Sequence, residues 1–100
     1  MNKNRLPMTF RMLHFFSTVQ DGTVDHLMEA LKSEYGSERQ FQRKNLSSYL
    51  FSMRENGLIE DSKVELDENE DLRIFYQITD EGSKLLERYL PKDWKNSVGA

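Results

Sequence analysis

Residues 46–60 read LSSYLFSMRENGLIE, and this stretch decides the fold because a helical pattern gives way to a strand within it. In its first part apolar residues recur every three or four positions, which is typical of one face of a helix; they are Leu46, Tyr49, Leu50 and Met53. Gly57 then indicates the end of this helix, since glycine tolerates the left-handed backbone conformation at which helices often end. Upstream, Ser37 and Gln40 have the spacing of a capping box. Together these signals predict a helix over residues 38–56.

Two further helices are predicted before this one. Pro7 suits the first turn of a helix, and apolar residues at helical spacing follow it over residues 8–20. After a glycine, Thr23 is a suitable N-cap for a second helix over residues 24–35. A short turn that contains glycine joins the second and third helices, and this arrangement is the signature of a helix-turn-helix.

A hairpin and a last helix are predicted after Gly57. Alternating apolar residues over 58–66 and the β-branched and aromatic run over 73–79 indicate two strands. Thr79 or Asp80 then caps a helix over residues 80–90.

The length of 100 residues fits one domain. We expect a single α+β domain over residues 1–100, with its ordered core at about 6–90. Pro91 stops the last helix, and residues 91–100, which include Trp94, are expected to form a polar tail.

Two stretches carry a resemblance to a known family. Residues 50–60 (LFSMRENGLIE) look like the end of a recognition helix entering a wing strand, and residues 76–86 (YQITDEGSKLL) look like the second wing strand turning into a closing helix. At this spacing, with a helix-turn-helix before them, they resemble the winged-helix transcriptional regulators of the MarR-like and PadR-like groups. The resemblance covers nearly the whole chain. It implies a winged helix-turn-helix with three helices, a two-stranded wing and a C-terminal helix, and it implies binding to double-stranded DNA.

The charge distribution departs from that family. The net charge is −3, and residues 60–72 hold one basic and seven acidic side chains. Four of these carboxylates lie within residues 67–71, at the predicted wing tip, where DNA-reading wings usually carry Arg or Lys. A phosphate backbone would repel this tip. The tip therefore points away from DNA, meets another protein or the partner subunit, or serves as a solubilising loop. A second departure from that family is that the predicted elements include no large effector domain.

The predicted third helix supplies the candidate DNA contacts. Arginine and lysine bind guanine edges or phosphates, glutamine and asparagine address adenine, and serine allows a close backbone approach. The candidates are Arg39, Gln42, Arg43, Lys44, Asn45, Ser47 and Ser48, with Lys63 and Arg73 on the wing strands. The alternative is a plain solvated helix face.

These observations predict a sequence-specific double-stranded DNA-binding protein, a small cytoplasmic transcriptional regulator. Phe10, Phe15, Tyr89 and Trp94 lie near the two ends of the chain and are candidates for a homodimer interface. A two-fold dimer would place two recognition helices ~34 Å apart on an inverted repeat. Two alternatives remain open: a plasmid or phage accessory factor at an origin-type site, and a protein-interaction winged helix that uses the acidic wing.

The sequence lacks the residues that a metalloprotein, an enzyme or a membrane protein would need. The chain has no cysteine and only two histidines, His14 and His26, so we expect no disulfide and no metal site. The acidic stretch fails as a calcium loop, because Leu72 and Ile78 stand where glycine and glutamate are required. No nucleophile or phosphate-loop signature is present, so we expect neither catalysis nor a cofactor. No apolar run has the length of a membrane span.

Overall fold

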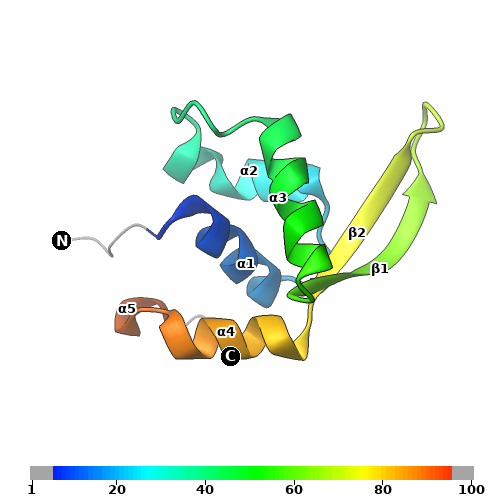
Figure 1. Cartoon of the computed structure of the whole chain (residues 1–100). Helices are drawn as coiled ribbons and strands as arrows, with labels where there is room; N and C mark the ends of the chain where they lie inside the picture. Colours follow the sequence, from blue (N-terminus) through cyan, green and yellow to red (C-terminus); the bar gives the residue numbers. More distant parts are fainter. Residues whose placement is uncertain (1–5, 96–100) are drawn as a thin grey trace.

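The computed structural model describes residues 6–95 and shows five helices and one hairpin there (Figure 1). In chain order the elements are α1 (Met8–Thr18), α2 (Val24–Tyr35), α3 (Arg43–Glu55), β1 (Ile59–Leu66), β2 (Leu72–Ile78), α4 (Asp80–Tyr89) and α5 (Lys92–Lys95). Three helices precede an antiparallel hairpin, and a closing helix follows it. This is the order of a winged helix-turn-helix, so the predicted α+β fold class is confirmed.

The hydrophobic core surrounds α1, which packs against α2, α4 and β2. Its almost fully buried side chains come from every main helix and from the base of the hairpin; they include Met12, Phe16, Leu27, Leu31, Leu46, Leu50, Ile59 and Leu86. Burying each such side chain contributes roughly 1.5–3 kcal/mol of transfer free energy. Because α3 turns Leu46 and Leu50 inward, its opposite face is left to solvent.

The hairpin is fastened to the body at its base and free at its outer end. Gly22, in the loop between α1 and α2, forms a one-residue bridge with Tyr76, with two backbone hydrogen bonds of 2.9 and 2.8 Å. At the other end Leu66 pairs with Leu72. Figure 1 shows this outer part extending away from the helices. These hydrogen bonds hold the base of the hairpin beside the core, and its outer half is exposed to solvent.

Two predicted helix caps are confirmed. The Thr23 hydroxyl accepts the backbone N–H of His26 at 3.1 Å at the start of α2, and His26 Nδ1 accepts the N–H of Thr23 in return. The Thr79 hydroxyl accepts the N–H of Gly82 at 3.1 Å at the start of α4. It also donates to the carbonyl of Gly57 at 2.6 Å. Thr79 thereby ties the beginning of α4 to the end of α3.

The start of the predicted third helix is wrong. The helix expected over 38–56 begins only at Arg43, and the capping box expected at Ser37 does not form, since α3 starts without a side-chain cap. Gln42 has an extended backbone (φ −135°, ψ 145°) that interrupts helical geometry. Phe41 packs against the core. This packing, which local capping signals do not register, turns the chain before α3 begins.

The chain after Pro91 differs from the expected polar tail. It continues into α5, where Trp94 is only 8% exposed and its ring meets that of His14 edge-on at 5.0 Å. The ordered core therefore extends to residue 95. The remainder of the expected tail, residues 96–100, lies outside the described residues.

Gly82 makes a close approach that yields a first prediction. A Cβ on this residue would clash with the carbonyl oxygen of Leu58 and come within 2.8 Å of Ile78 Cγ1. The Leu58 carbonyl cannot retreat freely, because it accepts the N–H of Thr79. We expect Gly82→Ala to lower the free energy of unfolding by roughly 1–3 kcal/mol, measured by urea denaturation. Ser83→Ala is the control, and equal stability of both variants would contradict this packing.

Candidate functional site

The outward face of α3 is an exposed surface of the helix-turn-helix. Residues three, four and seven positions apart lie on one side of a helix. On the side opposite Leu46 and Leu50, this spacing aligns Lys44, Ser47, Ser48, Phe51 and Glu55, all of which are exposed. We call these five residues the α3 outer face. It runs from a basic end to an acidic end and has two short side chains in its middle.

A hollow of about 230 Å³ lies between α3, α2 and the hairpin. Arg43 and Ser47 line it from α3, and Arg73 lines it from β2. Asp25 from the start of α2 and Asp67 from the hairpin add two carboxylates to its wall. Three of the predicted contact residues therefore share one hollow, in which two arginines are balanced by two acids.

Arg43 is held by Asp25 at this hollow. Its Nε donates to Asp25 Oδ1 at 3.1 Å, and a terminal nitrogen lies 3.5 Å from Oδ2. The hydrogen bond from Arg43 keeps the pKa of Asp25 below its usual value, and the same bond raises the pKa of Arg43. Both side chains are about 60% exposed, so solvent screens the pair and it contributes at most about 1 kcal/mol. Its main effect is to orient the guanidinium.

This pair predicts a small, pH-dependent effect. We expect Asp25→Asn to lower the free energy of unfolding by at most about 0.5 kcal/mol at pH 7. Folding lowers the pKa of Asp25, so the pair contributes its full stabilisation above the pKa that Asp25 has in the unfolded chain. This contribution is lost as the pH falls through the pKa that Asp25 has in the folded protein. Urea denaturation at several pH values should show the difference from wild type shrinking below about pH 4. A difference that grows on acidification would contradict the pairing.

The residues just before α3 lie on a loop. Arg39 and Gln42 are exposed there. Asn45, in the first turn of α3, is partly buried and donates its amide to the carbonyl of Gln40 at 3.2 Å, so it supports the loop. Within residues 6–95, neither Arg39 nor Lys44 takes part in a recorded ion pair. Both cations are therefore available for an external anion.

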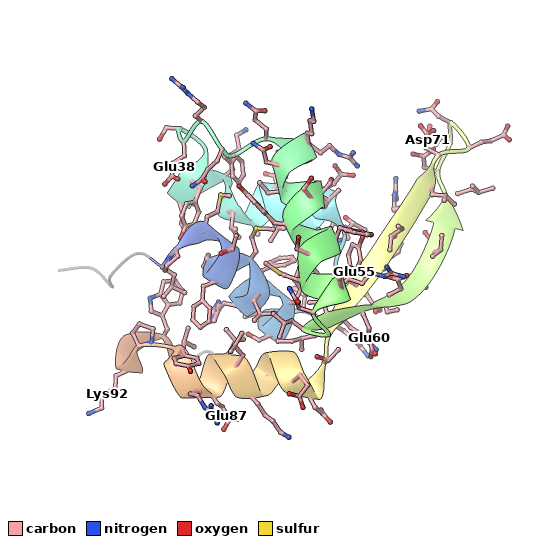
Figure 2. All side chains as sticks on the ribbon, in the orientation of Figure 1. Glu38, Glu55, Glu60, Asp71, Glu87 and Lys92 are labelled. Carbon is pink, nitrogen blue, oxygen red and sulfur yellow. The ribbon has the colours of Figure 1, made fainter. Side chains whose placement is uncertain are left out.

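The hairpin cations are partly engaged. Lys63 Nζ lies 3.5 Å from Glu65 Oε2 and 4.5 Å from the centroid of the Phe75 ring. Arg73 faces Glu65 across the strands. Asp71, at the outer end of the hairpin, lies far from α4 and α5 in Figure 2. The strands therefore hold two cations among three carboxylates, and the tip at residues 67–71 holds four carboxylates and no cation.

A comparison with solved structures identifies this fold. No protein-family model matches the chain, and no curated protein sequence matches it. Among solved structures, a PadR-like transcriptional regulator from Bacillus cereus superposes with a TM-score of 0.63, at 21% identity, over 90% of this chain and 79% of that one. The fold is a winged helix. In this fold α3 is the second helix of the helix-turn-helix, and β1 and β2 form the wing.

The predicted dimer residues separate into two groups in this winged helix. Phe15 and Trp94 are buried within the single chain, where Phe15 meets Phe16 edge-on at 5.1 Å. Phe10 is partly buried against the core, whereas Tyr89 on α4 is 62% exposed. Core packing thus accounts for Phe15 and Trp94, and Tyr89 is the one side chain of this set that is mostly exposed to solvent.

The described part of the chain has neither a metal-ligand cluster nor a membrane-spanning helix. Residues 6–95 contain no group of three or more His, Asp or Glu side chains placed to hold a metal ion. None of the helices described there combines the length and apolar character needed to cross a bilayer. His14 is buried on α1, while His26 is exposed and takes part in the α2 cap.

Two residues of the candidate site were missed in the sequence. Asp25 was not singled out, because its contact with Arg43 spans 18 positions and depends on how α2 packs against α3. Phe51 lies in the stretch that decides the fold, yet it is 58% exposed. Its spacing of seven from Lys44 and three from Ser48 was a readable signal that it shares their face.

Proposed function

We propose that this chain is a sequence-specific double-stranded DNA-binding protein that acts as a small transcriptional regulator in the cytoplasm. The observation that carries the proposal is the α3 outer face: an exposed recognition helix with Lys44 at its basic end and two serines in its middle. In winged helices and other helix-turn-helix proteins this helix enters the major groove. The regulatory role is supported by the fold shared with a protein described as a PadR-like transcriptional regulator.

Each candidate contact has a proposed task. Arg39 and Lys44 bind phosphates at the edge of the groove, because they are exposed and carry no recorded ion pair. Gln42 and Arg43 address base edges, with Asp25 holding the guanidinium in one direction. Ser47 and Ser48 let the helix backbone approach closely, and Asn45 acts by supporting the loop.

The wing has a secondary task in this proposal. Lys63 and Arg73 lie on its strands and contact the flanking phosphates. The carboxylates of residues 67–71 are kept away from the backbone, since DNA carries one negative charge per ~1.7 Å of duplex. The wing therefore adds weak contacts along its strands and none at its tip.

A homodimer completes the proposed binding unit. Tyr89 is exposed on α4, with Phe10 partly exposed on the neighbouring α1, and a second copy would cover both. Figure 1 places α4 on the other side of α1 from α2, so this pairing leaves α3 free. Two copies related by a two-fold axis would read an inverted repeat with half-sites ~34 Å apart.

A binding selection tests the proposal. Random duplexes are incubated with the protein at moderate salt, and bound molecules are amplified and sequenced over several rounds. We expect an inverted repeat with a defined half-site. A pool that stays unenriched would refute sequence-specific binding, whereas a single unrepeated site would refute only the dimer. A selected sequence that occurs chiefly at replication origins of plasmids or phages would assign the same activity to an accessory factor.

One observation favours a second function. Val64, Leu66 and Leu72 are exposed aliphatic side chains on the wing, and the register places them on one face. They adjoin the acidic tip, and such a surface suits a protein partner with basic and apolar side chains. This protein-interaction role would stand alone if the selection fails, and would accompany DNA binding if it succeeds.

A further inference from the structure

Phe51 is an exposed aromatic residue on the surface proposed to face DNA. The chain has six phenylalanines, and the other five are buried or partly buried. Phe51 alone leaves more than half of its surface, 58%, in solvent. It contributes little to the core, which α3 reaches through Leu46, Leu50 and Met53. Its ring is therefore available for an external contact.

The neighbours of Phe51 indicate what that contact is. Ser47 and Ser48 lie one turn before it on the α3 outer face, and Lys44 lies two turns before it, roughly 10 Å along the axis. The short serines leave the ring standing above the helix surface. Glu55 lies one turn after Phe51, but its carboxylate is 3.4 Å from a terminal nitrogen of Arg54. The charge that this face leaves for a partner is therefore that of Lys44, which favours a polyanion over an apolar protein surface. A nucleic-acid groove satisfies both the cation and the protruding ring.

Within a major groove the only apolar group on a base edge is the C5-methyl of thymine. A phenyl ring can neither donate nor accept a conventional hydrogen bond, so it discriminates among bases through this methyl group. We propose that Phe51 is a specificity-determining residue that packs against a thymine methyl in each half-site. This inference rests on the proposed function, because it requires α3 to lie in the major groove.

Removal of single methyl groups tests the inference. In the selected duplex each thymine is replaced in turn by deoxyuridine, which pairs identically but lacks the methyl, and the dissociation constant is measured by fluorescence anisotropy. For wild type we expect one thymine per half-site at which the replacement weakens binding roughly 3- to 5-fold, the value for one buried methyl group. For Phe51→Ala the thymine and deoxyuridine duplexes should bind equally at that position.

Two variants control the experiment. Ser52→Ala changes an exposed neighbour that points roughly 100° away around the helix, so it should retain the full methyl preference. Phe51→Leu keeps an apolar side chain and should retain part of it. A far-ultraviolet circular dichroism melt of each variant confirms that the fold is unchanged, which the exposure of Phe51 leads us to expect.

The possible outcomes separate this inference from the proposed function. If wild type binds the duplex but no deoxyuridine position matters, or if Phe51→Ala keeps the preference, the role of Phe51 is refuted and DNA binding stands. If wild type binds no duplex, the proposed function fails and the role of Phe51 fails with it. A preference that is absent in Phe51→Ala and kept in Ser52→Ala supports the inference.

Discussion

The double variant Arg39→Ala/Lys44→Ala is expected to bind a selected duplex more weakly than wild type, on the order of 100-fold for each bound protomer, because each charge-assisted hydrogen bond to a phosphate contributes about 1.5 kcal/mol. Both side chains are exposed, one on the loop before α3 and one on the α3 outer face. Within the described residues neither side chain forms an ion pair with a carboxylate. Replacing them therefore costs little in folding and removes two proposed phosphate-binding groups. Anisotropy titration at fixed salt measures the change.

Lys92→Ala is the matched control for that variant. Lys92 is an exposed cation on α5, and Figure 2 shows it on the opposite side of the molecule from the wing tip at Asp71. The substitution changes the net charge by one without touching the proposed interface, so the affinity should stay within about 2-fold of wild type. The single variants Arg39→Ala and Lys44→Ala are measured beside it. If Lys92→Ala weakened binding as much as either of them, the loss of affinity would come from the change in net charge and not from the α3 surface.

The second large effect concerns stability. Leu50 is 1% exposed and anchors α3 in the core. We expect Leu50→Ala to lower the free energy of unfolding by roughly 2–5 kcal/mol, because a cavity remains where the side chain was. A domain of this size is stable by only about 5–15 kcal/mol in total, so the variant should unfold at a clearly lower temperature. Thermal and urea denaturation followed by circular dichroism give the difference.

The next residue in the chain provides the control for this prediction. Phe51→Ala removes a larger side chain, yet Phe51 lies on the exposed face of the same helix. Its effect on the free energy of unfolding should stay within about 0.5 kcal/mol. Similar destabilisation in the two variants would mean that Phe51 is packed in solution and would overturn the assignment of faces on α3.

The element order was predictable from local signals. The change from a period of 3.6 to a period of 2 at Gly57, and the caps at Thr23 and Thr79, depend on residues close together in the chain. The start of α3 was mispredicted, because Ser37 offers a cap locally while Phe41 packs against the distant core. A contact between distant segments overrode a short-range preference there.

The site was predictable only as a set of residues. Spacing on the predicted helix identified Lys44, Ser47 and Ser48 correctly as exposed. It did not indicate that Asp25 would hold Arg43, because that requires the angle between α2 and α3. It also did not indicate that Trp94 packs beside His14, since residues 80 positions apart meet there only after the chain has folded.

The salt dependence of duplex binding tests most directly whether the surface around Lys44 meets DNA. The logarithm of the binding constant falls linearly with the logarithm of salt concentration, with a slope of about 0.9 for each phosphate neutralised. For Arg39→Ala/Lys44→Ala we predict a slope smaller than that of wild type by about 1.8 for each bound protomer, which is about 3.6 for the proposed homodimer. For Lys92→Ala we predict an unchanged slope. An unchanged slope in the folded double variant would contradict the placement of this surface on DNA.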